Sequence, residues 1–237
     1  MKTLRILGLP LLVTEILALR EMNAHDLRSQ HLQQARNLVE HLELRNTSYR
    51  HGPPDVTFTS PYVAHADCSG FIQSLLRSSY GYTEDQIKAK FGHARMTAEN
   101  YHDLIMQNST FEQVSDLKRV VEGDLLAVKY DSPKDKSSGH VMLVAAAPKE
   151  IVATQPIEPD TRQWEVVVID SAKSGHGKAD TRHGAGEAGK DHDGVGRGVI
   201  RVYTDPHGSV VGYTWSVGGK TLVRQSEAHL AIGRLKP

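Results

Sequence analysis

The sequence has only one cysteine, Cys68, among its 237 residues. An intrachain disulfide needs two, so the fold must be held together by its core alone. A lone thiol is compatible with the cytosol, and equally with an exported enzyme whose thiol is kept free for catalysis. The cysteine is therefore a candidate nucleophile, and the rest of the chain must indicate whether it reacts.

The sequence also lacks net charge, because 28 basic residues balance 28 acidic ones and no run of lysine or arginine stands out. Nucleic acids and anionic membrane surfaces attract basic patches, so we expect neither as a partner. The apolar run ILGLPLLVT at residues 6–14 is too short to span a bilayer, so we expect no integral membrane association. The oligomeric state is left open.

The N-terminus has a pattern that resembles a signal peptide. A basic start, MKTLR, precedes the apolar run, but Glu15 interrupts that run and the nearest candidate cleavage site is around Ala24. We predict that residues 1–24 are a signal peptide, with export to the periplasm or the extracellular space, or alternatively an N-terminal helix of a cytoplasmic protein. The remaining residues, 25–237, contain no linker and are expected to form a single domain.

Hydrophobic periodicity divides this domain into helices followed by strands. Apolar residues recur at helical spacing in residues 25–44, 68–80, 84–90 and 97–107, while residues 56–62 form an edge strand at best. Six later segments are rich in β-branched residues and read as strands: 123–130, 139–145, 164–170, 198–203, 210–215 and 229–234. This order predicts an α+β fold in which N-terminal helices pack on a mostly antiparallel β-sheet.

Three residues in this arrangement suggest nucleophilic catalysis. Cys68 follows a predicted N-cap, Asp67, so it lies in the first turn of a helix, where unpaired N–H groups and the helix dipole favour a thiolate. His140 opens one predicted strand and Asp170 closes the next. Because the end of one antiparallel strand lies beside the start of its neighbour, the carboxylate can orient the imidazole. Taken singly, each residue is more often a packing or capping residue.

The motifs around these residues resemble a known family. The segments DCSGF at residues 67–71, GDLL at 123–126 and GHVMLV at 139–144 are similar to the signature of the NlpC cell-wall peptidases, relatives of the CHAP amidases within the papain-like group. The resemblance covers roughly residues 62–171. It implies that Cys68 is the nucleophile, His140 the base and Asp170 the third catalytic residue of a papain-like domain.

The resemblance also implies an activity. It predicts a cysteine peptidase or amidase (a thiol protease) that hydrolyses an amide bond of a peptidoglycan stem peptide through an acyl-enzyme, without a cofactor. Tyr62 would line the substrate cleft, and Asp67 and Ser69 would bind a substrate amine. An insertion at residues 147–162 separates His140 from Asp170, so His176 competes for the third catalytic role.

The long segment 174–198 is rich in glycine and polar residues, and loops of that length are usually functional or mobile. Its histidines and aspartates match no zinc template, so we expect a solvated flap facing the substrate and no metal site. Trp164, on a neighbouring strand, is a candidate substrate contact or an ordinary packing residue.

Two alternative functions remain open. The thioester can be resolved by an amine or alcohol, which would make the protein an acyltransferase or transpeptidase on the same fold. In a non-catalytic binding module, the helix at Cys68 would be only a packing element. The module predicts a buried Cys68, with His140 beyond hydrogen-bond reach and no cleft beside it.

Overall fold

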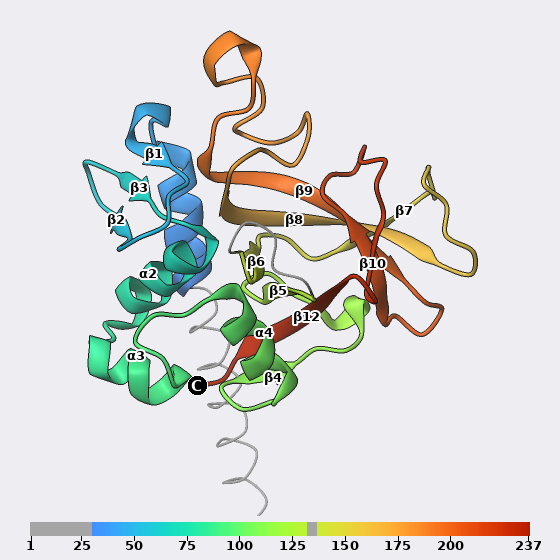
Figure 1. Cartoon of the computed structure of the whole chain (residues 1–237), viewed down its shortest axis with the longest axis horizontal. Coiled ribbons are helices and arrows are strands. Elements are labelled where there is room, and N and C mark those ends of the chain that lie inside the picture. The colour runs from blue at the N-terminus through green and yellow to red at the C-terminus, as the bar shows by residue number, and fades with distance from the viewer. Residues whose placement is uncertain (1–29, 132–136) are drawn as a thin grey trace, which may run out of the picture.

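The computed structural model describes residues 30–131 and 137–237, and the predictions for residues 1–24 lie outside these ranges. The described chain has an α+β fold, with helices in its first half and a mostly antiparallel sheet in its second (Figure 1). Within the described ranges, no helix has both the length and the apolar character needed to cross a membrane.

The helices agree closely with the sequence prediction. Residues 30–41 are helical, followed by α2 (Cys68–Tyr80), α3 (Glu84–Phe91) and α4 (Ala98–Met106). Short 3-10 turns lie at η1 (Leu44–Asn46), η2 (Leu117–Arg119) and η3 (Glu187–Gly189). The predicted stop at Gly81 is confirmed, because this residue caps α2 with a φ of 65°, which favours glycine.

A nine-stranded sheet forms the second half of the fold, in the order β11-β10-β9-β8-β6-β5-β12-β4, with β7 pairing to β8. All its pairings are antiparallel. The six predicted strands are present as β5 (Leu125–Tyr130), β6 (Gly139–Val144), β8 (Arg162–Ala172), β9 (Gly194–Thr204), β10 (Val210–Thr214) and β12 (Ala228–Leu235). Three short strands were not expected: β4 (Phe111–Gln113), β7 (Lys149–Ile151) and β11 (Val223–Arg224).

A small second sheet precedes the cysteine helix. It comprises β1 (Thr47–Ser48), β2 (Asp55–Thr57) and β3 (Val63–His65), with β3 in the middle and parallel to β1. Two hydrogen bonds connect this region to the large sheet: the Val195 N–H donates to Thr47 Oγ1 at 2.8 Å, and Ser171 Oγ donates to the Ala66 carbonyl at 2.7 Å. The backbone just before Cys68 is therefore fixed to β8.

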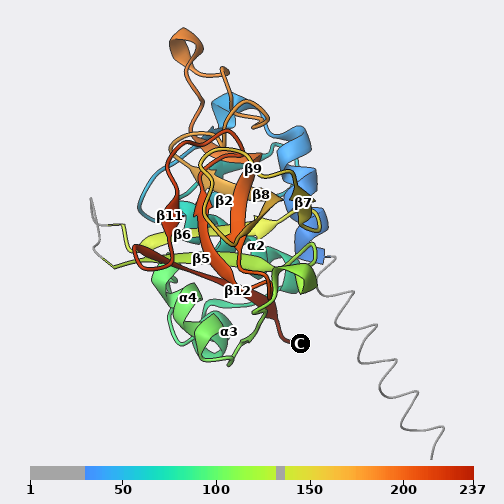
Figure 2. The same cartoon turned by 90° about the vertical axis from the view of Figure 1, so that its right-hand side faces the viewer.

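Side chains of successive strand residues point to opposite faces of the sheet, and the apolar ones form a separate core on each face. In β5, Leu125 and Ala127 belong to the core shared with the helices, whereas Leu126 and Val128 belong to the core on the opposite face. Helix α2 packs against β6 and β8. The connection between β8 and β9 projects beyond the sheet in both views (orange, Figure 1 and Figure 2).

Candidate active site

Cys68 is the first residue of α2 and is buried, with 4% of its surface exposed. Asp67 caps the helix as predicted, because its Oδ1 accepts a hydrogen bond from the Gly70 N–H at 2.7 Å. The first N–H groups of a helix have no intrahelical acceptor. The sulfur and free backbone donors therefore occur together at the start of α2.

His140 lies beside this helix because of the residue that precedes it. Gly139 has a φ of +153°, and a Cβ at this position would lie 1.8 Å from the Val128 carbonyl oxygen, so only glycine fits. His140 Nε2 donates to Asp170 Oδ2 at 2.5 Å, and the Cys68 side chain is near enough to influence the pKa of the ring. With Nε2 bonded to the carboxylate, Nδ1 is the nitrogen left for the sulfur.

Opposing effects set the protonation of this histidine. Burial lowers the pKa of His140, but the negative charge of Cys68 and the hydrogen bond to Asp170 outweigh burial and raise the pKa from 6.5 to about 10. The imidazole is therefore favoured as a cation beside the Asp170 carboxylate, and a cationic imidazole next to a cysteine is the arrangement that activates a thiol nucleophile.

Asp170 is completely buried and accepts hydrogen bonds from three side chains. Besides His140, the donors are His176 Nε2 at 3.0 Å to Oδ2 and Arg182 Nη2 at 2.9 Å to Oδ1. Burial raises the pKa of Asp170, but the charges of His176 and Arg182 and the histidine hydrogen bonds hold it well below its usual value. Asp170 therefore stays ionised in the interior.

His176 was the other candidate for the third catalytic role, and it contacts the Asp170 carboxylate. Its Nε2 faces the carboxylate, and its Nδ1 lies 2.8 Å from the backbone carbonyl oxygen of Trp215. His176 therefore supports the Asp170 carboxylate, and Asp170 is the group that contacts His140.

The 174–198 segment is a solvated flap only in part, because His176, Asp180 and Arg182 are buried while Lys178 and Thr181 beside them are exposed. Arg182 is completely buried and also bonds Asp180 through Nη2 at 2.8 Å. The glycines of β9 make room for these groups: a Cβ at Gly196 would lie 2.5 Å from Arg182 Nε, and one at Gly198 would lie 2.2 Å from Asp180 Oδ2. The buried charges of Asp170 and Asp180 compensate the arginine.

The remaining histidines and aspartates of this segment pair locally. His183 Nδ1 lies 2.8 Å from Asp191 Oδ1, with the histidine side chain 44% exposed. Among residues 30–131 and 137–237, no three histidine, cysteine or acidic side chains converge as they would around a metal ion.

Two cavities open beside Cys68 and His140. The first, of about 120 Å³, is lined by Cys68, Asp67, Ser69 and Arg95, among others. The second, of about 260 Å³, is lined by His140, Lys173 and Trp215, among others. Four residues line both cavities: Tyr49, His51, Ser137 and Gly139. The sulfur and the imidazole are therefore next to space that can hold a substrate.

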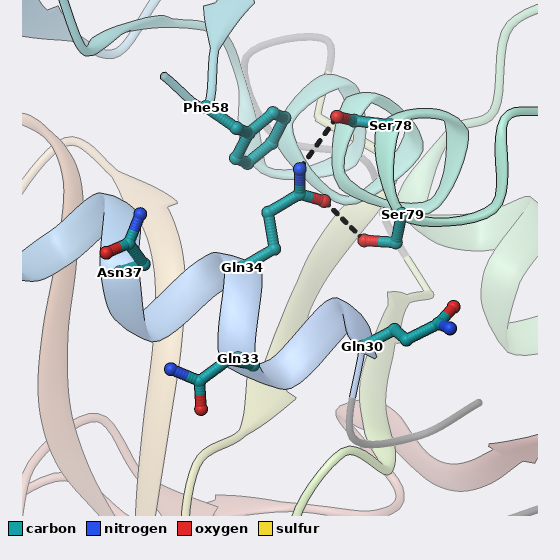
Figure 3. A pocket seen from close by; sticks show the side chains of 7 residues that line it. All are labelled: Gln30, Gln33, Gln34, Asn37, Phe58, Ser78 and Ser79. Carbon is teal, nitrogen blue, oxygen red and sulfur yellow. Dashed lines mark hydrogen bonds between the residues drawn. The ribbon is translucent and has the colours of Figure 1, made fainter. Parts of the chain in front are cut away.

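A larger cavity, of about 630 Å³, lies between the helical residues 30–41 and α2 (Figure 3). Amide and hydroxyl side chains line it together with Phe58, and Gln34 bridges Ser78 and Ser79 through hydrogen bonds of 2.8 and 2.5 Å. The described residues that line it include no thiol, imidazole or carboxylate, so they are less suited to catalysis than those of the smaller cavities.

The predicted substrate-binding residues fall into two groups. Asp67 and Ser69 line the first cavity. Tyr62 lines neither cavity beside Cys68, because it stacks on His41 with ring centroids 5.2 Å apart and accepts a 3.0 Å hydrogen bond from Asn37.

Trp164 likewise lies outside both cavities. It is in the core on the opposite face of the sheet, where its Nε1 donates to Thr204 Oγ1 at 3.0 Å. Six residues (170 − 164) separate it from Asp170 on β8, which is about 20 Å along a strand. Of the two roles considered for Trp164, substrate contact and packing, the structure therefore shows packing.

Two aromatic residues at the site were missed from the sequence. Tyr49 lines both cavities, and its pKa is raised by burial and by the nearby charges of Cys68 and Asp67. The Trp215 ring lies 4.9 Å from that of His140 and 4.3 Å from that of His176. A loop tyrosine and an aromatic at the end of a strand carry no motif, so only the tertiary structure identifies them.

Comparison with known proteins gives one informative similarity. The chain is 30% identical over 219 residues to "Uncharacterized protein R653" of Acanthamoeba polyphaga mimivirus, in an alignment covering 85% of this chain and 94% of the viral protein. No family model and no solved structure matches the chain.

Proposed function

The chain belongs to the same family as the mimivirus protein, and we propose that it is a cysteine hydrolase with a papain-like, NlpC-type fold that cleaves an amide bond in a cell-wall peptide. One observation carries the proposal: buried His140 hydrogen-bonds the ionised Asp170 and lies near Cys68, beside two cavities. The resemblance of the DCSGF and GHVMLV segments to the NlpC signature supplies the substrate class.

The proposed reaction begins with attack of the Cys68 thiolate on the amide carbonyl carbon. The developing oxyanion is stabilised by the Cys68 backbone N–H at the start of α2, and the His140 imidazolium gives its proton to the leaving amine. Water, deprotonated by neutral His140, then attacks the thioester and releases the acid and the free thiolate. Asp170 keeps the ring oriented and stabilises its cationic form.

The same geometry argues against a non-catalytic binding module. A module predicts Cys68 as a packing residue with His140 out of reach and no adjacent cleft. Here Cys68 is buried, but His140 is near enough for Cys68 to influence its pKa, and one cavity is lined by Cys68 and the other by His140. Burying charged groups lowers the stability of the fold, and titratable groups with strongly shifted pKa values cluster at functional sites.

The test is incubation of the protein with peptidoglycan fragments, read by mass spectrometry. We expect cleavage at an amide bond, with turnover lowered by about 10⁴-fold or more in Cys68→Ala and in His140→Ala because each loses a participant in bond breaking. Circular dichroism should show that both variants keep the fold. Full activity in Cys68→Ser would contradict the mechanism, and transfer of the acyl group to an added amine in place of water would identify a transferase.

A further inference from the structure

We infer that the cavity beside Cys68 binds a carboxylate group of the substrate and that Arg95 is the residue that recognises it. This inference rests on the proposed function, because it concerns what the same nucleophile attacks. It assigns a binding role to Arg95 and changes the expected ligand of this cavity from an amine to an acid.

The first step is that Asp67 is already fully bonded within the chain. Its Oδ1 accepts from the Gly70 N–H at 2.7 Å and from Ser69 Oγ at 3.0 Å. Its Oδ2 faces His51 Nδ1 at 3.2 Å and Arg95 Nη2 at 3.4 Å. A substrate ammonium group would have to displace these donors, so Asp67 is poorly suited to bind the amine that the family resemblance implies.

The second step is that the backbone on both sides of Arg95 is held in place. The buried Gln73 side chain donates from Nε2 to the Ala94 carbonyl at 2.6 Å and accepts at Oε1 from the Met96 N–H at 3.0 Å. The Arg95 side chain is nevertheless 48% exposed and lines the cavity. Its attachment point is thus ordered while its guanidinium faces the space that a substrate would enter.

The third step is that the Arg95 guanidinium has donors left for a ligand. Its contact with Asp67 involves Nη2 alone, so the geometry is not the bidentate pairing that arginine forms with a carboxylate. A substrate carboxylate in the cavity can provide that second, planar pairing. At about 120 Å³, the cavity suits a small group of this kind.

The fourth step is the sign of the charge around the opening. Asp67 is the only acidic residue among the described residues that line the two cavities. The basic side chains there include Arg95 and Lys173, whose Nζ lies 5.9 Å from the centroid of the Tyr49 ring. An anionic substrate group is therefore attracted to this opening, whereas a cation meets no free carboxylate among the lining residues that the structure describes.

Alkylation of Cys68 by two matched reagents tests the inference without knowledge of the natural substrate. Iodoacetate and iodoacetamide share a leaving group and differ in carrying a carboxylate or a neutral amide. We expect the ratio of their rate constants, iodoacetate over iodoacetamide, to exceed that of N-acetylcysteine by about tenfold, the size of one charge-assisted contact. In Arg95→Gln the ratio should fall about tenfold while the iodoacetamide rate changes less than about twofold.

Two further variants separate local recognition from general charge. Arg50→Gln removes the same charge from an exposed arginine that pairs with Asp55 at 3.8 Å and lines neither cavity, so the ratio should not change. Arg95→Lys keeps the charge but loses the planar fork, so an intermediate ratio is expected. His140 is the same in all variants, so its attraction for iodoacetate cancels in the comparison.

The outcomes distinguish this inference from the proposed function. Failure of both reagents to modify Cys68 would overturn the proposed function and this inference with it. Modification by both reagents, with a ratio equal to that of N-acetylcysteine or insensitive to Arg95→Gln, would overturn the inference alone and leave the nucleophile in place.

Discussion

Two aspartates of this protein have the same kinds of partner in opposite surroundings. Asp67 faces His51 and Arg95, whose side chains are 58% and 48% exposed. Asp170 contacts His140, His176 and Arg182, and the side chains of His176 and Arg182 are fully buried. In both, a buried carboxylate meets imidazole and guanidinium groups, but only the partners of Asp170 are buried with it.

The difference determines what each cluster can do. Exposed ion pairs contribute little to stability because water and salt screen them, so the groups around Asp67 can exchange partners with a ligand. Buried ion pairs are costly to form and more costly to break, since removing one partner leaves an uncompensated charge in the interior. The Asp170 cluster is suited to fixing a geometry, and the Asp67 cluster to binding.

The largest effect is expected for Asp170→Asn. The imidazole loses its charged partner, so kcat should fall on the order of 10³–10⁴-fold. The free energy of unfolding should fall by roughly 3 kcal/mol, because His176 and Arg182 lose a negative partner, although Arg182 keeps Asp180. Steady-state kinetics and urea unfolding measure the two effects. An active variant of unchanged stability would show that burial does not distinguish the two clusters.

The pH dependence of stability should give an intermediate effect. The pKa of His140 is raised from 6.5 to about 10, so its contribution is fully present below pH 6.5 and is lost as the pH rises toward 10. The pKa of Asp170 is lowered, so its contribution is present above pH 3.8 and is lost as the pH falls through its folded-state value.

Urea unfolding at a series of pH values checks this expectation. Between pH 6.5 and 10 the free energy of unfolding of the wild type should decline progressively. His140→Gln should abolish this decline. Cys68→Ala should make the decline smaller and complete at a lower pH, since the group that contributes most to raising the histidine pKa is gone. A decline of equal size in His140→Gln would contradict the assignment.

The smallest effect is expected for Asp67→Asn, the same substitution in the cluster whose basic partners are exposed. Asparagine caps helices about as well as aspartate, and ion pairs with exposed partners contribute little. The free energy of unfolding should fall by less than about 1 kcal/mol. Urea unfolding of Asp67→Asn and Asp170→Asn under the same conditions checks this. Equal decreases in the free energy of unfolding would show that the burial of the partners does not distinguish the two aspartate clusters.

Local sequence signals were sufficient for the elements that carry Cys68, His140 and Asp170. The cap at Asp67, the helical spacing after Cys68 and the β-branched strands are properties of neighbouring residues, which a sequence displays directly. The antiparallel placement of β6 beside β8 followed from the strand order and is confirmed by their register. These features depend on local preference and on the rule that adjacent antiparallel strands run in opposite directions.

The sequence did not predict which charged side chains are buried or which aromatic residues line the cavities, because both depend on residues distant in the chain. Arg182 lies in a polar, glycine-rich segment that is typical of solvated loops, yet Asp170 and Asp180 compensate it in the interior. Tyr62 was predicted to line the cleft and packs on His41, while Tyr49 lines both cavities. Such choices are made by tertiary packing, which no single motif encodes.

The hairpin of β8 and β9 has a consequence for how the site assembles. Asp170, His176, Asp180 and Arg182 all lie between residues 170 and 182, so this network forms when one hairpin closes. Cys68 and His140 are 72 residues apart (140 − 68) and meet only after long-range docking. The orienting half of the site is therefore built mostly from local contacts, which close at a lower cost in chain entropy than the long-range docking of Cys68 beside His140.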